Sequence, residues 1–515
     1  MKLNFVQNTK RNVVAGGINQ VFQLLFPFLN RTLFLWLLGP EYLGLNGLFA
    51  SILGVLRLAE LGFGSAVGCS MFKLVARDDR EQICACLHFF RSLYHGVGIV
   101  IFVIGLCLLP FIPHIIHGYV PPGINIYVLY LIHLVNTSVG YFFFSYRGCI
   151  LTVHHRGDVI TNINTIVSIV QYITVALILI FTRNYYYYVI ATVIFTVISN
   201  LLLLFATRRL FPDIEPHGNP KRALRHRILV DARSVFLHKI GGVVLYLFDN
   251  IVISYSLGLA AIAVYGNYNF IRLAVAGFVG IMAGSIRAGI GNRIHTDTRE
   301  NIFLLFMKLH RLSMIGAVWS MAVMIALYQP FMRVWTKEDP ALMRHMLTPL
   351  LMASCFFVLQ ARQMLLVFKE AADIWRQDQW KPLCSATLNL GLNILFVVTF
   401  PEKYKLDGVI FSTVLAITLV DAPWETYIMF TRFFNAIQAR DYLKLQAKFI
   451  LIAVLLSLAT WYGANAVPLD GVFGLLLKGC VAAIISGGLT VVFFLSDIKV
   501  FIEKLLNRNR ESSFH

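Results

Sequence analysis

Long apolar runs follow one another along almost the whole chain, separated only by short polar segments. A helix needs about 20 apolar residues to cross the hydrocarbon layer of a bilayer. Hydrophobic residues make up 58% of the 515 residues and charged residues only 14%, whereas soluble domains carry about 25% charged residues. No water-soluble fold could bury this excess, and the runs lack the strict alternation of a transmembrane barrel. The sequence therefore predicts an all-α polytopic membrane protein.

Charge clusters, prolines and glycines divide the apolar runs into about fourteen predicted spans. They lie near residues 12–38, 43–72, 88–113, 125–146, 157–182, 186–206, 231–256, 261–287, 308–331, 342–367, 383–400, 406–430, 448–464 and 472–495. The first span continues past Pro27 and Arg31. It is longer than the roughly 7–15 apolar residues of a signal peptide, so we expect it to be retained.

Lys and Arg residues are distributed unevenly between the two sides of the predicted membrane. With the N-terminus inside, about 33 of them fall on cytoplasmic segments, about 6 on outer segments and about 5 within spans. This asymmetry predicts that both termini are cytoplasmic. It also accounts for the net charge of +18, so no nucleic-acid partner is expected. The run from Tyr185 to Tyr188 lies at an outer span end and is interpreted as part of an interfacial aromatic belt.

The longest inner loop, residues 207–230, is basic and proline-rich without apolar periodicity, which indicates a linker. It separates six spans from eight, as in a two-lobed transporter. Sliding the chain along itself superposes Leu38-Gly39 on Leu257-Gly258, which favours an internal repeat. We therefore predict two lobes around a central cavity. The parts are an N-terminal lobe of six helices (1–206), the linker (207–230), a C-terminal lobe of six helices (231–430), two additional helices (431–495) and a cytoplasmic tail (496–515).

Charged residues inside the predicted spans are the most informative positions, because each costs about 2.5–3.5 kcal/mol at the centre of a membrane helix on insertion scales. They are Arg31 in the first span, Arg57 and Glu60 in the second, Lys239 and Asp249 in the seventh, Arg272 in the eighth, and Asp421 and Glu425 in the twelfth. Each is expected to face a cavity, a partner or the membrane interface. Their depth favours a functional role for Arg31, Asp249 and Arg272.

Some of these charges have structural alternatives. Arg57 and Glu60 share a helix face and could neutralise each other as an ion pair. Lys239 lies about two turns from a cytoplasmic span end and could extend its ammonium group to the interface. Asp421 and Glu425 are one turn apart on either side of Pro423 and could also be structural.

Arginines on both lobes suggest the chemistry of the cargo. Arg31, Arg57 and Arg272 belong to the first two helices of one lobe and the second helix of the other, so lobes that pack face to face would place them in one cavity. Guanidinium groups are permanently charged forks that suit phosphate oxygens, which predicts binding of a diphosphate. Glu60 and Asp249 are candidates for H⁺ or Na⁺ coupling, since buried carboxylates can exchange an ion, and Lys239 is a further cavity candidate.

Motifs for bond-breaking chemistry are absent from the sequence. There is no GxxxxGK[ST] phosphate loop, no HExxH metal motif and no loop long enough for a soluble catalytic domain. The eight cysteines form no CxxC pair. We therefore expect a protein that is not an enzyme and that uses no cofactor and no metal site.

Three segments carry a resemblance to a known family. LFPFLNRTLFLWLLGPEYLGLNGLF at 25–49, LAELGFGSAVG at 58–68 and Pro423-Trp424-Glu425 in the twelfth span resemble the polysaccharide transporter or O-antigen flippase branch of the multidrug/oligosaccharidyl-lipid/polysaccharide exporter superfamily. The family shares the plan of fourteen spans. Related lipid II flippases carry cavity arginines on their first, second and eighth helices, and by resemblance these would be Arg31, Arg57 and Arg272.

This resemblance implies a flippase in the bacterial inner membrane. It would move an undecaprenyl-diphosphate-linked oligosaccharide from the cytoplasmic to the periplasmic leaflet by alternating access, for O-antigen, lipopolysaccharide or other cell-surface polysaccharide synthesis. The polyprenyl tail of this substrate would stay in lipid along the last two helices. Other polysaccharide-assembly membrane proteins are potential partners. The alternatives are a multidrug or cation antiporter, which would favour a carboxylate-lined cavity, and a membrane glycosyltransferase or polymerase, which would need a sizeable outer loop.

Overall fold

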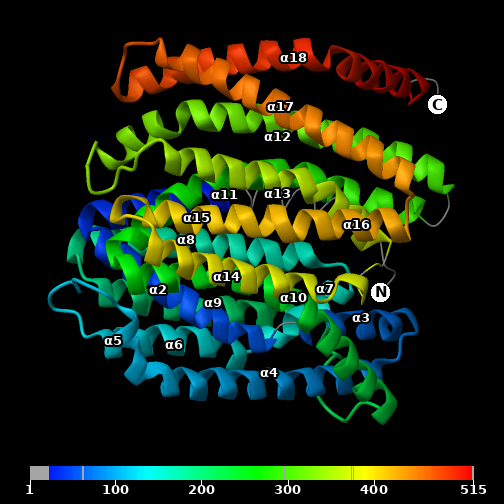
Figure 1. Cartoon of the computed structure of the whole chain (residues 1–515). Helices are drawn as coiled ribbons and strands as arrows, with labels where there is room; N and C mark the ends of the chain where they lie inside the picture. The colour runs from blue at the N-terminus through cyan, green and yellow to red at the C-terminus, as the bar shows by residue number, and fades with distance from the viewer. Residues whose placement is uncertain (1–21, 61–62, 295–296, 373, 375, 513–515) are drawn as a thin grey trace. The chain divides into compact units, whose positions relative to one another are not determined.

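The described residues of the protein are helical and contain no strand. The computed structural model describes residues 22–60, 63–294, 297–372, 374 and 376–512 (Figure 1). They divide into two compact units, Met1–Ala263 and Val264–His515. Each unit is considered separately below.

The predicted spans coincide with helices throughout the described residues. Ten of the described helices are long and apolar enough to cross a membrane, or eleven if the bent pair Ile126–Phe142 and Ser145–Val153 forms one span. Three shorter apolar helices, Phe22–Leu37, Pro40–Leu56 and Leu247–Leu257, lie at the first, second and seventh predicted spans. The prediction of an all-α, multi-pass membrane protein is confirmed.

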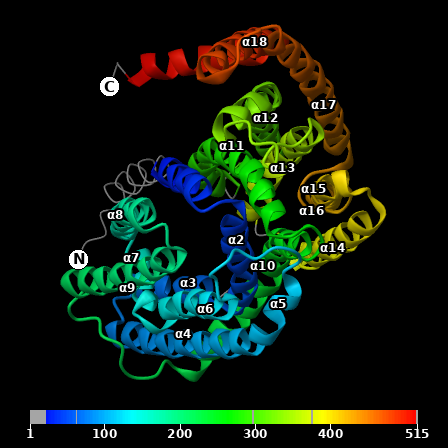
Figure 2. The same cartoon turned by 90° about the vertical axis from the view of Figure 1, so that its left-hand side faces the viewer.

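The first unit begins in the described residues with the helix Phe22–Leu37. It continues with α2 (Pro40–Leu56), the 3₁₀ turn η1 (Arg57–Glu60), α3 (Phe63–Ala76), α4 (Arg80–Leu108), η2 (Leu109–Phe111), α5 (Ile112–Ile115), α6 (Ile126–Phe142), η3 (Ser145–Arg147), α7 (Gly148–Val153), α8 (Gly157–Thr182), α9 (Tyr185–Leu210) and α10 (Arg222–Leu257). Side-chain caps start several of them: Asp79 accepts from the Gln82 backbone N–H at 3.2 Å, and Asn184 accepts from that of Tyr186 at 2.9 Å. Helix α4 packs on α6, and α8 on α9 (Figure 2).

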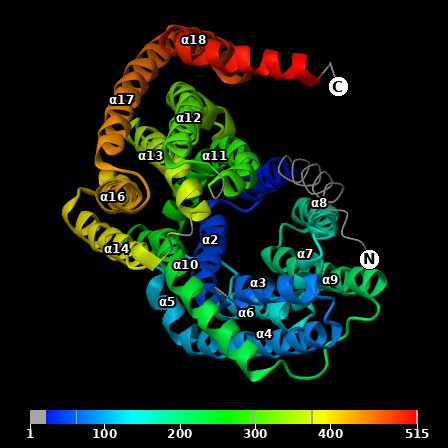
Figure 3. The ribbon, with the colours of Figure 1, turned by 90° about the vertical axis from the view of Figure 1, so that its right-hand side faces the viewer.

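Helix α10 packs closely against α2 and α3 (Figure 3). The Asn250 amide donates to the Ser51 hydroxyl at 2.8 Å, and a Cβ on Gly54 would lie 3.0 Å from a methyl carbon of Leu247. At Gly44 the approach is closer still, since a Cβ there would lie 1.9 Å from the Leu259 carbonyl oxygen. Only glycine can stand at that position without moving the backbone. These contacts explain why the compact unit extends to Ala263, whereas the division into lobes at 207–230 stays a prediction.

The predicted linker, residues 207–230, includes the end of one helix and the start of the next. Helix α9 ends at Leu210 and α10 begins at Arg222, because the basic residues that follow Pro220 are good helix formers. Asp213 pairs with Arg80 at 2.9 Å. Glu215 contacts the buried Arg147 and lies 3.2 Å from Arg208. The segment between the helices is therefore held by ion pairs to its own unit.

The second unit takes in most of α11 (Leu259–Arg293), whose first residues belong to the first unit. It continues with α12 (Arg299–Thr336), α13 (Leu347–Ala371), η4 (Arg376–Asp378), α14 (Lys381–Thr399), η5 (Glu402–Tyr404), α15 (Lys405–Ala416), η6 (Ile417–Asp421), α16 (Ala422–Arg432), α17 (Ala436–Asn465) and α18 (Gly471–Ser512). The segment η6 is a π-helical turn. Helices α12, α17 and α18 pack on one another (Figure 1).

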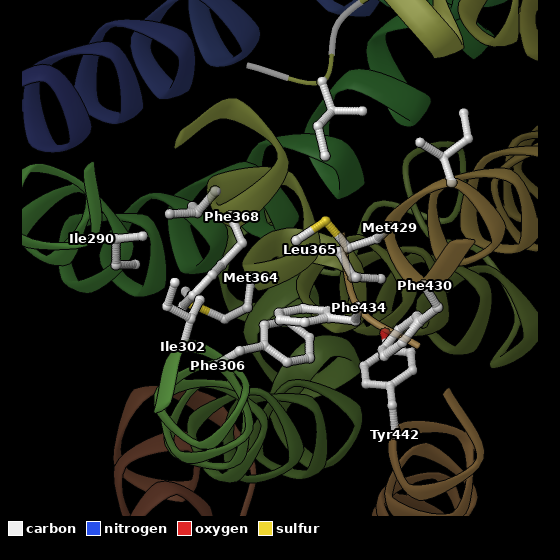
Figure 4. Close-up of a cluster of buried hydrophobic side chains, with 13 residues drawn as sticks. Ile290, Ile302, Phe306, Met364, Leu365, Phe368, Met429, Phe430, Phe434 and Tyr442 are labelled. Carbon is white, nitrogen blue, oxygen red and sulfur yellow. The ribbon is translucent and has the colours of Figure 1, made fainter. Parts of the chain in front are cut away.

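An aromatic cluster joins four helices of the second unit (Figure 4). The Phe306 ring on α12 lies 5.2 Å from Phe368 on α13 and 5.7 Å from Tyr442 on α17, measured between ring centres. Tyr442 lies 5.3 Å from Phe430 on α16. Within a bilayer, such van der Waals packing rather than exclusion from water holds helices together. The cluster fixes α13 and α16, which carry buried charges described below.

Candidate functional site

Arg31 lies on the helix Phe22–Leu37 in a polar and aromatic environment of the first unit. Its Nη2 donates to the Ala263 carbonyl oxygen at 3.2 Å. The neighbouring Asn30 amide donates to the Tyr188 hydroxyl at 3.2 Å, and the Phe34 ring packs edge-on against Tyr188. The hydrogen bond to the Ala263 carbonyl orients the guanidinium. Arg31 is thus a half-buried cation with a defined orientation.

The tyrosine run belongs only in part to an aromatic belt. Tyr187 is 55% exposed, but Tyr185 is 2% exposed and its hydroxyl donates to Asn46 Oδ1 at 3.3 Å. Nε2 of His133 lies 3.3 Å from the same hydroxyl. Tyr185 and Tyr188 are three residues apart and therefore share one helix face. This inward polar face was missed, and the i, i+3 spacing was the signal that could have revealed it.

Glu60 ends the 3₁₀ turn η1 that follows α2 in the second predicted span. Its two carboxylate oxygens accept hydrogen bonds from the Tyr94 hydroxyl at 2.6 Å and the Tyr141 hydroxyl at 2.5 Å. The contacts of the described residues include no ion pair between Arg57 and Glu60. Arg57 is exposed and approaches the Tyr141 hydroxyl. Irregular backbone at membrane depth occurs where it is buried in protein or lines a water-filled cavity.

Asp249 and Lys239, the two candidates of the seventh span, both lie on α10. Asp249 is fully buried on α10, beside the Asn250 that contacts α2. Lys239 lies in the same helix, but its side chain falls outside the described residues. Its role in a cavity or at the interface stays a prediction.

Arg272 is held on α11 in the second unit. It is 4% exposed, and its Nε donates to Asn269 Oδ1 at 2.8 Å. The Tyr328 hydroxyl donates to the Tyr268 carbonyl at 2.5 Å and the two rings stack, which ties α12 to this part of α11. Arg31 and Arg272 belong to different compact units. A cavity that they share stays a prediction.

The acids of the twelfth span form a buried ion cluster with two cations from other helices. Arg362 on α13 donates from Nε to Glu425 at 2.9 Å and from Nη1 to Asp421 at 2.8 Å. Lys381 at the start of α14 contacts Glu425 and lies 3.8 Å from Asp421. All four residues are less than 10% exposed. Two positive and two negative charges balance, which supports the structural interpretation of both acids.

Sequence reasoning missed both cations of this cluster. Arg362 lies within the tenth predicted span, and its position there was a signal that it needed a partner. Lys381 precedes the eleventh span and gave no such signal. Asp421 ends the π-helical turn η6, and π turns inside helices are frequent at functional sites.

A profile of the polysaccharide biosynthesis protein family matches residues 9–286, more than half of the chain. The chain belongs to this family. The predicted membership among polysaccharide transporters is thereby confirmed, and the match covers the first eight predicted spans. A comparison with curated protein sequences finds no match.

Solved structures with the same fold come from transporters. The lipid II flippase MurJ in an inward closed conformation has a TM-score of 0.68 and 16% identity, over 95% of this chain and 99% of that one. An inward-facing multidrug resistance MATE family transporter of the MOP superfamily has a TM-score of 0.59 and 16% identity, over 79% and 94%. A MOP superfamily transporter from Pyrococcus furiosus has a TM-score of 0.54 and 16% identity, over 82% and 94%. At this identity the likeness shows the fold.

Proposed function

We propose that the protein is a flippase for a polyprenyl-diphosphate-linked oligosaccharide. It moves this lipid from the cytoplasmic to the periplasmic leaflet of the bacterial inner membrane by alternating access, for cell-surface polysaccharide synthesis. The observation that carries the proposal is the match to the polysaccharide biosynthesis family over residues 9–286. A fold similar to that of a lipid II flippase over 95% of the chain supports it.

The diphosphate is bound by Arg31, Arg57 and Arg272 in this proposal. Arg31 and Arg272 each have a hydrogen bond that orients the guanidinium, to a backbone carbonyl and to a side-chain amide oxygen, respectively. A guanidinium can present two parallel N–H donors to phosphate oxygens, which gives orientation as well as attraction. A cationic drug would be repelled by the same groups, which disfavours the antiporter alternative.

The polyprenyl tail remains in an apolar environment while the sugar crosses. An apolar pocket of about 590 Å³ lies in the second unit between α13, α16 and α17. Leu443 and Ile450 of α17 line it and are 55% and 53% exposed. This surface supports α17, the first of the last two helices, as part of the expected path of the tail.

Loss of the protein is expected to trap its substrate. In cells that lack it, the lipid-linked oligosaccharide should accumulate in the cytoplasmic leaflet and the surface polysaccharide should disappear. Isolation of the accumulated lipid and mass spectrometry would name the sugar, and a membrane-impermeant sugar-modifying reagent applied to spheroplasts would report the leaflet. Normal delivery of the lipid to the periplasmic leaflet in these cells would refute the proposal.

Ion coupling is assigned to Glu60, with Asp249 as the second candidate. The carboxylate of Glu60 has two tyrosine donors on α4 and α6, so gain of a proton must rearrange bonds to two neighbouring helices. We expect Glu60→Gln to lower flipping in proteoliposomes by about tenfold to a hundredfold, since a hydrogen bond to a charged group contributes about 1.5–3 kcal/mol. The variant should also lose the response of flipping to an imposed pH gradient.

A matched control separates coupling from a general loss of charge. Glu81→Gln, at the exposed start of α4, should leave both the rate and the gradient response unchanged. Tyr94→Phe and Tyr141→Phe should each reduce the rate less than Glu60→Gln. A Glu60→Gln protein that still responds fully to the pH gradient would transfer the coupling role to Asp249.

A further inference from the structure

A pocket on the first unit is lined by none of the three arginines proposed to bind the diphosphate, Arg31, Arg57 and Arg272. It has a volume of about 490 Å³ and is lined by α4 together with Asn219 and Arg225. Arg225 belongs to the first two turns of α10, and its guanidinium carbon lies 5.2 Å from the centre of the Phe89 ring. The start of α10 therefore lies beside α4, as the two views agree (Figures 2 and 3). This pocket is called the α4 groove below.

One end of the α4 groove is basic and polar. The nearby acids Asp213 and Glu215 are paired with Arg80 and Arg147, and Arg225 forms no ion pair among the described residues. Nδ1 of His88, which also lines the groove, is buried and has no hydrogen-bond partner in the part of the chain that is described. This end therefore presents the exposed positive charge of Arg225, which a phosphate group could engage.

The other end of the α4 groove is apolar and opens toward lipid. Val100 lines it and is 46% exposed, and Val103 and Ile104 continue the same helix with 51% and 45% exposure. Exposed valine and isoleucine on a membrane-spanning helix face acyl chains. Between the two ends lies Gly96, where an added Cβ would meet no atom within 4 Å. The groove thus changes from basic to apolar over about 18 Å, the length of twelve helical residues.

We propose that the α4 groove binds an anionic phospholipid. Its phosphate lies against Arg225 and its acyl chain follows α4 past Gly96 to Val100. The choice of occupant follows from charge: the inner leaflet of the membrane is negatively charged and attracts basic residues next to spans, and the predicted orientation places Arg225 on that side. The bound lipid tethers the start of α10 to α4, a role independent of the transported lipid.

The test compares lipids and variants on the purified full-length protein. Native mass spectrometry measures the affinity of the protein for phosphatidylglycerol and for phosphatidylcholine, and the tightest binding event for each lipid is compared. Wild-type protein is expected to prefer phosphatidylglycerol. Arg225→Gln should weaken that binding about fivefold, the usual effect of one basic residue at a membrane surface, and Arg222→Gln, on the same helix but outside the groove, should have less effect.

A second variant tests whether the phospholipid binds in the α4 groove by filling the groove instead of removing its charge. Gly96→Leu places a side chain in the open part of the groove and also improves helix propensity, so the protein should fold while binding of phosphatidylglycerol is lost. Gly391→Leu on α14 is the matched control, because a Cβ there also meets no atom within 4 Å. Three outcomes would overturn the proposal: equal binding of both lipids, unchanged binding in Gly96→Leu, or inorganic phosphate that competes as strongly as phosphatidylglycerol.

Discussion

Replacing Arg362 by methionine is expected to destabilise the second unit by about 3–5 kcal/mol, the usual cost of removing one partner from a buried ion pair. The guanidinium donates to both Glu425 and Asp421. Its loss leaves two buried carboxylates with Lys381 as their remaining cation in the cluster. Methionine is shorter but unbranched, flexible and of similar volume, so the change removes mainly charge and hydrogen bonds. The thermal unfolding midpoint in detergent and the yield of folded protein measure the effect.

Two further variants show whether uncompensated charge is the cause. Arg333→Met is the matched control, because Arg333 also pairs with an acid, at 3.8 Å from Asp470, but is 54% exposed. It should change the midpoint little, as exposed pairs contribute about 0–1 kcal/mol. Adding Glu425→Gln to Arg362→Met restores charge balance and leaves Lys381 with Asp421, so the double variant should recover part of the stability. If Arg362→Met unfolds at the same temperature as Arg333→Met, the cluster is not structural.

Removing the charge of Arg31 or Arg272 is expected to reduce flipping by about tenfold to a hundredfold, since a hydrogen bond to a charged group contributes about 1.5–3 kcal/mol. Arg31→Gln and Arg272→Gln each remove the positive charge but keep a polar side chain. Lysine at either position keeps the charge but not the fork, so Arg31→Lys and Arg272→Lys should retain intermediate activity. Proteoliposomes that contain the lipid-linked oligosaccharide provide the assay.

The control for these variants is Arg209→Gln. Arg209 is exposed at the end of α9 and belongs to none of the proposed contacts, so the rate should equal that of the wild type. Each variant should unfold within a few degrees of the wild type, which separates a binding defect from misfolding. Full-rate flipping by Arg31→Gln and Arg272→Gln would exclude the proposed recognition of the diphosphate.

Prediction from the sequence succeeded for properties that depend on consecutive residues, such as the hydropathy of a span. Helix α8 was placed at 157–182 and runs from Gly157 to Thr182. The seventh span was placed near 231–256, and the helix that contains it, α10, begins earlier, at Arg222. Hydropathy marks the apolar section of a helix, and α10 extends beyond that section with charged residues that are themselves good helix formers. Boundaries in polar sequence were therefore the least accurate part of the fold.

Only the identity of the candidate site residues could be predicted, because they are charged residues within predicted membrane spans. The cost of charge in lipid singled out Arg31, Glu60, Asp249 and Arg272 without any structure. Their neighbours were not predictable. An ion pair with Arg57, three residues away, was one alternative for Glu60, but the carboxylate accepts hydrogen bonds from Tyr94 and Tyr141, which are 34 and 81 residues distant.

The sequence by itself determined that this chain spans a membrane, where most of its spans lie and which family it resembles, because transfer into lipid depends on about 20 consecutive residues at a time. The tertiary structure decided which charges neutralise one another. Arg362 and Glu425 are 63 residues apart and meet only when α13 packs against α16. Pairing energy depends on distances of a few ångströms between side chains from different helices, and no local pattern of residues encodes those distances.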